Sequence, residues 1–318
     1  MQVNKPYEIN ELFDPITYKK SGSVLRMMEY FLGLEVRKEG LTNYINNRTY
    51  DTATTDVLWA FLGDAASKYS VELNGLTVKG IMDTWSIQKK FPVVKVKINR
   101  KKYAEITVTH KMFQSGIHGG YLYAIYDFLQ NKYIIEDNYW HIPLIFIQNL
   151  ATGHKKALAC WIICDNKVFG YYRVDYDEMN WDLLHDQLQN NHTQIDVINR
   201  AQIIDDALNL ASVNQIKKTS ERALNITSYL KKEVDWLPWE TLYNNFERLQ
   251  NLLSGTEAGA LFNSHIQRLA LHLYEFYTFN EDPKDKALDL RLRKIAVRIA
   301  CETNFAPCVE EVKNFFFF

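Results

Sequence analysis

The sequence predicts a multidomain α+β protein in three parts: a helical part over residues 1–91, a small β-sandwich over residues 92–178, and a helical superhelical array of the HEAT/armadillo kind over residues 179–318. Apolar residues recur at helical spacing up to about residue 90, alternate with polar residues after Pro92, and return to helical spacing from Trp181 to the end. With 318 residues, 47% of them apolar, the chain is long enough to bury the cores of two or three domains.

The first helix is predicted to start at Asp14 and Pro15, because the Asp carboxylate accepts from a free N–H and proline loses nothing at the first helical position. Its buried face is predicted from apolar residues at helical spacing, namely Val24, Leu25, Met28, Phe31 and Leu32. Gly33 and Gly40 are interpreted as helix stops, and Thr54 precedes the next amphipathic helix.

The middle part is predicted from alternation. Val94, Val96 and Ile98 alternate with polar residues, which is typical of half-exposed antiparallel strands. Three further apolar runs predict short strands, at residues 140–147, 156–164 and 168–174. A small β-sandwich is the most economical fold for several short strands separated by turns.

The last part is predicted to consist of paired antiparallel helices. The helices are expected at residues 198–211, from Pro238 and Trp239 onward, and through 259–277 and 288–301. Such pairs bury their faces on their neighbours in a superhelical array. The chain ends in four phenylalanines, Phe315–Phe318. Because a terminal repeat needs a polar outer face, we expect this array to be incomplete and its end truncated or artificial.

Charge and composition exclude some classes of protein. Lys plus Arg (37) nearly balance Asp plus Glu (38), which argues against nucleic-acid binding. No apolar run reaches the roughly 18 residues that span a bilayer, and the N-terminus lacks the apolar stretch of a signal peptide. Cys160 and Cys164 are predicted to be buried thiols in a strand, whereas Cys301 and Cys308 flank a polar turn and are placed to bridge locally.

Several strings resemble the zinc aminopeptidases of the aminopeptidase N family. Residues 13–27 fit Phe-Asp-x-Ile-x-Tyr-x-Lys-x-x-Ser-Val-Leu-Arg-Met, and residues 199–211 repeat the family's Asn-Arg-Ala-Gln run. Residues 170–177 match the family's Gly-Tyr-Tyr-Arg-Val-Asn-Tyr-Asp at every position except Asp175. Lys90 replaces the usual glycine before Phe-Pro. The resemblance covers nearly the whole chain and roughly the C-terminal half of such an enzyme.

The resemblance implies a thermolysin-like catalytic domain, of which residues 1–91 are the C-terminal helical part, and an enzyme that removes N-terminal residues from peptides. In that family the tyrosine at the position of Tyr18 donates to the oxyanion of the tetrahedral intermediate. The zinc motif His-Glu-x-x-His is absent, because none of the eight histidines is followed by Glu. We therefore expect this chain to bind no zinc and to be inactive alone.

The ectoenzymes of the family carry a disulfide at the positions of Cys301 and Cys308, which implies an oxidising compartment. Three sequons, at Asn47, Asn191 and Asn225, are candidate glycosylation sites and fit an extracellular or plasma-membrane-associated protein. The alternative is a non-catalytic scaffold that binds peptides or proteins and derives from such an enzyme. The sequence leaves the oligomeric state open, including a homodimer.

Overall fold

The structure is a computed structural model that describes residues 5, 16–88, 90–99, 105–112, 122–127, 132–135, 140–142, 144, 146–148, 161–214 and 217–316. The predicted helix start at Asp14 and the predicted strand position of Cys160 lie outside the described residues. The chain divides into two compact units. The first unit comprises residues 1–147 and 163–174, and the second comprises residues 148–162 and 175–318.

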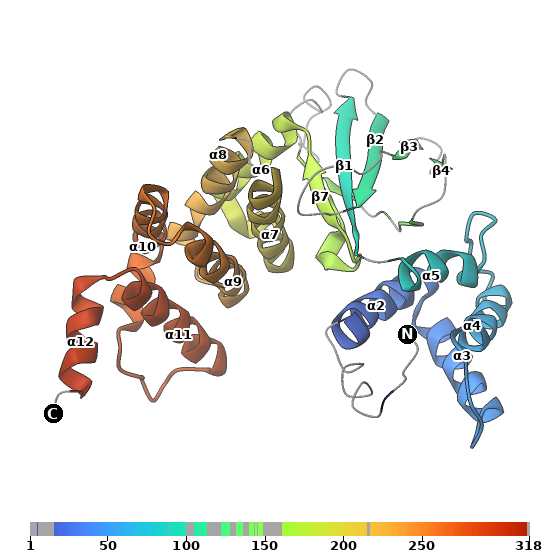
Figure 1. Cartoon of the computed structure of the whole chain (residues 1–318). Coiled ribbons are helices and arrows are strands. Elements are labelled where there is room, and N and C mark those ends of the chain that lie inside the picture. The colour runs from blue at the N-terminus through green and yellow to red at the C-terminus, as the bar shows by residue number, and fades with distance from the viewer. Residues whose placement is uncertain are drawn as a thin grey trace. The chain divides into compact units, whose positions relative to one another are not determined.

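The first unit opens with helices (Figure 1). They are the π-helical turn η1 (Ile16–Lys20), α2 (Ser21–Leu32), α3 (Leu34–Asn47), α4 (Thr55–Lys68) and α5 (Val78–Ser86). Helix α2 packs on α3 and α5, and α4 packs on α3 and α5. The helical start predicted after Thr54 is confirmed, since Thr54 is the N-cap of α4. The largest side chains that these helices bury completely are Met27, Met28, Leu62, Met82 and Trp85.

Two sequence-based expectations for these helices are wrong. Leu25 is 42% exposed, and Met27 takes its place in the buried face of α2. Gly33, at φ 90°, ends α2 as predicted, but Gly40 lies inside α3. A Cβ atom on Gly40 would meet Leu62 Cδ2 at 2.7 Å and Leu62 Cα at 3.1 Å. The glycine at position 40 therefore allows α3 and α4 to approach closely, which is a role that local sequence does not reveal.

Within the described residues, the strands form two sheets. Their bounds are β1 (Pro92–Asn99), β2 (Glu105–Met112), β3 (Leu122–Asp127), β4 (Lys132–Ile135), β5 (Phe146–Gln148), β6 (Ile162–Cys164) and β7 (Arg173–Tyr176). One sheet has the order β4-β3-β2-β1-β7, and the other pairs β5 with β6. The pairs β1–β2, β2–β3 and β3–β4 are antiparallel, with Val96 opposite Val108 in β1 and β2. Antiparallel strands are thus confirmed, while the sandwich packing of the two sheets stays a prediction.

The strand predicted from residue 168 begins only at Arg173. Residues 166–168 form the 3₁₀ turn η3 (Asn166–Val168) instead. The Asp165 carboxylate accepts from the backbone N–H of Gly170 at 2.9 Å, and this contact closes a turn where an alternating strand was expected. Shortly before β1, Lys90 has φ 68°, the left-handed conformation that explains why its position suits glycine.

From Glu178 onward, the second unit is helical in its described residues (Figure 1). Its helices are α6 (Glu178–Asn191), η4 (His192–Gln194), α7 (Val197–Asn214), α8 (Lys217–Thr227), η5 (Ser228–Lys232), α9 (Trp236–Leu253), α10 (Glu257–Tyr277), α11 (Ala287–Glu302) and α12 (Ala306–Phe316). Helix α7 packs on α8 and α9, α11 packs on α9 and α10, and α6 packs on α8. The predicted helical pairs are confirmed, and Pro238 lies in the first turn of α9, where no backbone hydrogen bond is lost.

A buried ion pair holds the centre of this unit together. Arg200 of α7 donates from Nε to Glu233 Oε2 at 2.8 Å and from Nη1 to the carbonyl of Ile195 at 2.8 Å, and it also pairs with Asp235. The hydroxyl of Tyr229 donates to the same Glu233 oxygen at 3.1 Å. The side chains of Arg200 and Glu233 are 4% and 0% exposed, so the Asn-Arg-Ala-Gln string has a structural role here.

Candidate functional site

Tyr18 lies in η1, the π-helical turn that runs directly into α2. Its side chain is 59% exposed, whereas α2 buries Val24, Met27 and Met28 in the core of the first unit. The phenol is thus presented at the surface on a helix whose opposite face is fixed by packing. An exposed phenol on a packed helix can donate a hydrogen bond to a bound group. When nothing is bound, water can accept that hydrogen bond, so no buried donor is left unsatisfied.

Lys20 connects η1, the turn that carries Tyr18, to the segment after α5. Its Nζ donates to the backbone carbonyl of Gln88 at 2.5 Å, just beyond the end of α5, and partial burial lowers the pKa of this amine. Ser23 Oγ donates to the carbonyl of Lys19 at 2.9 Å. The Lys20 bond holds η1 against the segment after α5, about 70 positions away in sequence, whereas the Ser23 bond is local to η1 and α2.

A buried carboxyl lies in the turn that follows β6. Asp165 is 1% exposed, and burial raises its pKa to about 7, although the N–H groups of Gly170 and Phe169 and the charge of Arg26 act in the opposite direction. The unfolded chain has an ordinary Asp pKa near 3.9. Between about pH 4 and pH 7 the folded chain therefore binds more protons at this site than the unfolded chain.

We expect the free energy of unfolding of the first unit to fall as the pH rises from about 4 to 7, and Asp165 to add no further pH dependence above that range. Asp165→Asn keeps the acceptor for Gly170 but cannot ionise, so it should remove this part of the slope. The measurement is urea unfolding at pH 5, 6, 7 and 8. An unchanged slope in Asp165→Asn would contradict the assignment.

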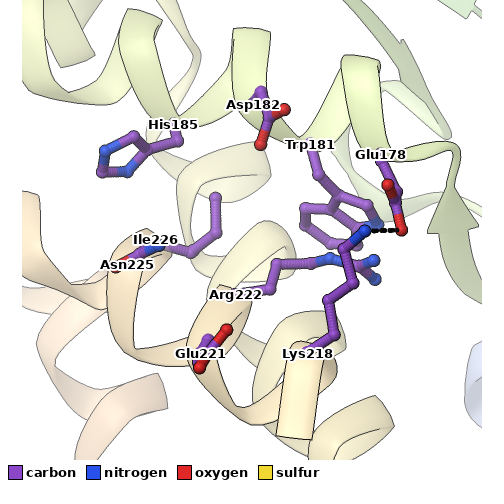
Figure 2. A pocket seen from close by; sticks show the side chains of 9 residues that line it. All are labelled: Glu178, Trp181, Asp182, His185, Lys218, Glu221, Arg222, Asn225 and Ile226. Carbon is purple, nitrogen blue, oxygen red and sulfur yellow. Dashed lines mark ion pairs between the residues drawn. The ribbon is translucent and has the colours of Figure 1, made fainter. Parts of the chain in front are cut away.

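A groove between α6 and α8 lies in the second unit (Figure 2). It has a volume of about 220 Å³ and is lined by Glu178, Trp181, Asp182, His185, Lys218, Glu221, Arg222, Asn225 and Ile226. Glu178 pairs with Lys218 across one end, and this contact lowers the pKa of Glu178. The groove is not evident from the sequence, although its lining residues recur at spacings of three and four on each helix.

Asp175 explains one departure from the family string. Its Oδ1 accepts from Trp181 Nε1 and from Arg222 Nη1, each at 3.3 Å, and the Arg222 guanidinium lies 5.2 Å from the centroid of the Trp181 ring. Both charged side chains are less than one-fifth exposed. An aspartate at this position therefore adds a charge partner for Arg222 that an asparagine would not supply.

We expect Asp175→Asn to lower the free energy of unfolding by about 0.5 to 1 kcal/mol, because it keeps the acceptor but loses the charge. Asp175→Ala should cost about 2 kcal/mol, since the buried Trp181 N–H then loses its partner. Urea unfolding followed by tryptophan fluorescence measures both. Glu178→Gln, which removes an exposed charge pair, is the control and should leave stability unchanged.

A second cavity, of about 600 Å³, lies in the first unit beside α4 and α5. Its walls include Asp56, Trp59 and Lys79, and Lys79 bridges Asp56 and Asp83 at 2.6 Å each.

Among the described residues no set of three or more His, Cys, Asp or Glu side chains is arranged to hold a metal ion. In the part of the chain that the structure describes, every helix is too short or too polar to cross a bilayer.

The remaining predicted sites lie apart from Tyr18 in sequence. Cys301 and Cys308 form the predicted disulfide between α11 and α12, with Cα atoms 5.3 Å apart. The sulfur of Cys164 is a buried thiol, 3.9 Å from the Tyr172 hydroxyl. The three sequon asparagines are exposed. They are Asn47 at the end of α3, Asn191 at the end of α6, and Asn225 on α8 at the groove.

Two sequence profiles match this chain. The profile of the "Peptidase family M1 domain" matches residues 1–85. The profile of the "ERAP1-like C-terminal domain" matches residues 161–317. The first match contains Tyr18 with η1 and α2 to α5, and the second contains the helices of the second unit.

Curated relatives cover nearly the whole chain. Aminopeptidase Ey of Gallus gallus is 35% identical over 96% of this chain and 32% of its own length. Aminopeptidase N of Homo sapiens is 30% identical over 99% of this chain and 33% of its own length. The thyrotropin-releasing hormone-degrading ectoenzyme of Mus musculus is 31% identical over 86% of this chain and 26% of its own length. The chain spans about a third or less of the length of these relatives.

Proposed function

This chain belongs to peptidase family M1 and corresponds to a C-terminal part of its aminopeptidases, and on this premise we propose that it works within a zinc-dependent aminopeptidase that removes N-terminal residues from peptides. The observation that carries the proposal is the similarity to aminopeptidases at 30–35% identity over 96–99% of the chain. The relatives are about three times longer, so the activity belongs to a protein of which this chain is a portion.

The M1 aminopeptidase family is zinc-dependent, and we propose that the zinc ligands of the intact enzyme lie outside this chain. The sequence has no His-Glu-x-x-His, and the described residues hold no cluster of potential ligands. In our proposal the metal is held outside this chain, and the chain alone is inactive. We propose that this chain contributes the oxyanion donor to the catalytic site of the intact enzyme.

We assign that role to Tyr18. When a peptide carbonyl is attacked, negative charge builds on its oxygen, and an aimed O–H stabilises that charge more than it stabilises the ground state. The surface position of the phenol on a helix packed into the core supports this assignment. We further propose that residues 1–91 are the end of a thermolysin-like domain, that residues 92–178 form a β-sandwich, and that residues 179–318 belong to a helical domain.

The location that we propose is the extracellular side of the plasma membrane. The disulfide between Cys301 and Cys308 fits an oxidising compartment, and one relative is an ectoenzyme by name. Glycosylation at Asn47, Asn191 and Asn225 would agree with that location, and all three side chains are exposed. The second candidate function, a scaffold that binds peptides or proteins without catalysis, is favoured by the charged groove between α6 and α8.

A chimera tests the proposal. The segment of chicken aminopeptidase Ey that matches this chain would be replaced by this chain, and the chimera and the isolated chain would be assayed for zinc and for hydrolysis of an alanyl-anilide. We expect bound zinc and turnover in the chimera, and neither in the isolated chain. A folded, zinc-loaded chimera without turnover would favour the scaffold, and turnover by the isolated chain would overturn the assignment of the metal to residues outside it.

A further inference from the structure

The turn between β6 and β7, residues 165–170, has an unusual backbone. Asp165, Lys167 and Val168 have φ of 74°, 55° and 55°, in the left-handed region that side chains other than glycine rarely adopt. A β-branched residue such as Val168 is rarer still in this region. The Asp165 carboxylate and the bond from Val168 N to Asp165 O at 3.2 Å hold the turn closed. Strain of this kind persists only where surrounding contacts fix it, and it often marks a functional element.

The strained backbone presents two carbonyls to helix α2. Arg26 donates from Nη1 to the carbonyl of Val168 and from Nη2 to the carbonyl of Lys167, each at 3.2 Å. The Phe169 ring lies 5.0 Å from the Arg26 guanidinium carbon and stacks on Tyr30, with ring centroids 3.9 Å apart. Arg26 and Tyr30 are four residues apart on α2, so their side chains lie on the same side of the helix. Both therefore contact the 165–170 segment from that side.

The contacts of Arg26 and Tyr30 with the 165–170 turn fix the position of α2 but bury little apolar surface. Arg26 and Tyr30 are exposed and Phe169 is only half-buried, so the contacts remove little apolar surface from water. What they do fix is the place of α2 relative to a segment about 140 residues away in sequence. Tyr18 stands eight residues before Arg26 on the same continuous helix, about 12 Å along the axis at the usual rise. A slide or rotation of α2 therefore moves the phenol directly.

We propose that the 165–170 turn is a brace for α2, and that Arg26 and Phe169 are positioning residues for Tyr18. The proposal rests on the proposed role of Tyr18 as oxyanion donor. Lys20 secures η1 at one end through the Gln88 carbonyl, and the brace secures α2 at Arg26, between one and two turns further on. Such a two-point attachment is what an aimed donor needs, because a misplacement of about 1 Å can cost on the order of 100-fold in rate.

The test uses the zinc-loaded chimera described above. We expect Arg26→Ala and Phe169→Leu to lower kcat by roughly 10- to 100-fold with KM almost unchanged, because orientation and not substrate affinity is lost. Phe169→Tyr keeps the ring that stacks on Tyr30 and should retain most of the activity, and Arg26→Lys should fall between, since an ammonium cannot reach both carbonyls. Lys38→Ala, which removes an exposed pair with Glu35 on α3, is the matched control.

A double-mutant cycle separates positioning from general damage. If the brace acts through Tyr18, Phe169→Leu should lower kcat no further once Tyr18→Phe is present. Independent losses that multiply in the double mutant, or full activity of Phe169→Leu and Arg26→Ala, would overturn the proposal.

Hydrogen exchange of peptides from residues 16–32 in the 318-residue chain tests the brace without any activity. Faster exchange in Arg26→Ala and Phe169→Leu than in the parent chain is expected, and unchanged exchange would count against the brace. If exchange rises but Tyr18→Phe leaves kcat unchanged, the brace stands and the proposed role of Tyr18 fails.

Discussion

Replacing Glu233 with alanine is expected to lower the free energy of unfolding of the second unit by about 3 to 5 kcal/mol. The substitution leaves the Arg200 guanidinium, 4% exposed, with Asp235 and the Ile195 carbonyl as its remaining partners. It also removes the acceptor of two backbone N–H groups, those of Val234 and Asp235, at 3.0 Å each. A buried cation that loses its main partner is costly because nothing replaces the water that it gave up on folding.

The measurement is urea unfolding followed by circular dichroism. Arg200→Met with Glu233→Leu is the informative partner variant, because it removes both charges at similar volume and should cost less than Glu233→Ala alone. Exposed ion pairs give the contrast: Glu178→Ala breaks a pair whose side chains are 60% and 63% exposed and should leave the midpoint unchanged. A small effect of Glu233→Ala would show that Asp235 or solvent satisfies Arg200.

Tyr18→Phe is expected to lower kcat of the zinc-loaded chimera by about 100- to 1,000-fold, the usual cost of losing one oxyanion donor. Phenylalanine keeps the ring and removes only the hydroxyl, and the 59% exposed side chain contributes little to the core, so folding should be unaffected. KM should change little, since the lost hydrogen bond forms mainly in the transition state.

Initial rates with an alanyl-anilide over a range of concentrations separate kcat from KM. Tyr50→Phe is the matched control, because Tyr50 belongs to the same unit and is fully exposed. A loss of less than about tenfold in Tyr18→Phe would mean that the phenol is not the main oxyanion donor.

Local patterns in the sequence predicted most of the helices and the first strands correctly. Gly33 ends α2, Thr54 caps α4, and Val94 and Val96 are buried in β1 as alternation requires. The disulfide between Cys301 and Cys308, expected from the family resemblance, is present as well. Each of these features depends on residues within about one or two turns of each other, so a sequence window contains the physical cause.

Some features of the candidate site were likewise evident from the sequence, whereas others depend on contacts between distant segments. The resemblance to the aminopeptidase N family singled out the string around Tyr18, and the sequence shows directly that His-Glu-x-x-His is absent, because both are read from neighbouring residues. The sequence did not reveal the hydrogen bonds from Arg26 to the 165–170 turn, the contact between Arg222 and Asp175, or the groove between α6 and α8. The charge partners in these contacts come from segments about 40 to 140 residues apart.

Patterns in neighbouring residues were enough to indicate the type of each well-patterned element, the cysteine pair and the family. Three other features became visible only in the folded chain: Gly40 allows helix packing against Leu62, Val168 lies in a strained turn and not in a strand, and Glu233 neutralises a buried Arg200. The physical reason is that periodicity and capping act within a few residues, whereas close approach, strain and charge burial depend on which distant segment the folded chain brings alongside.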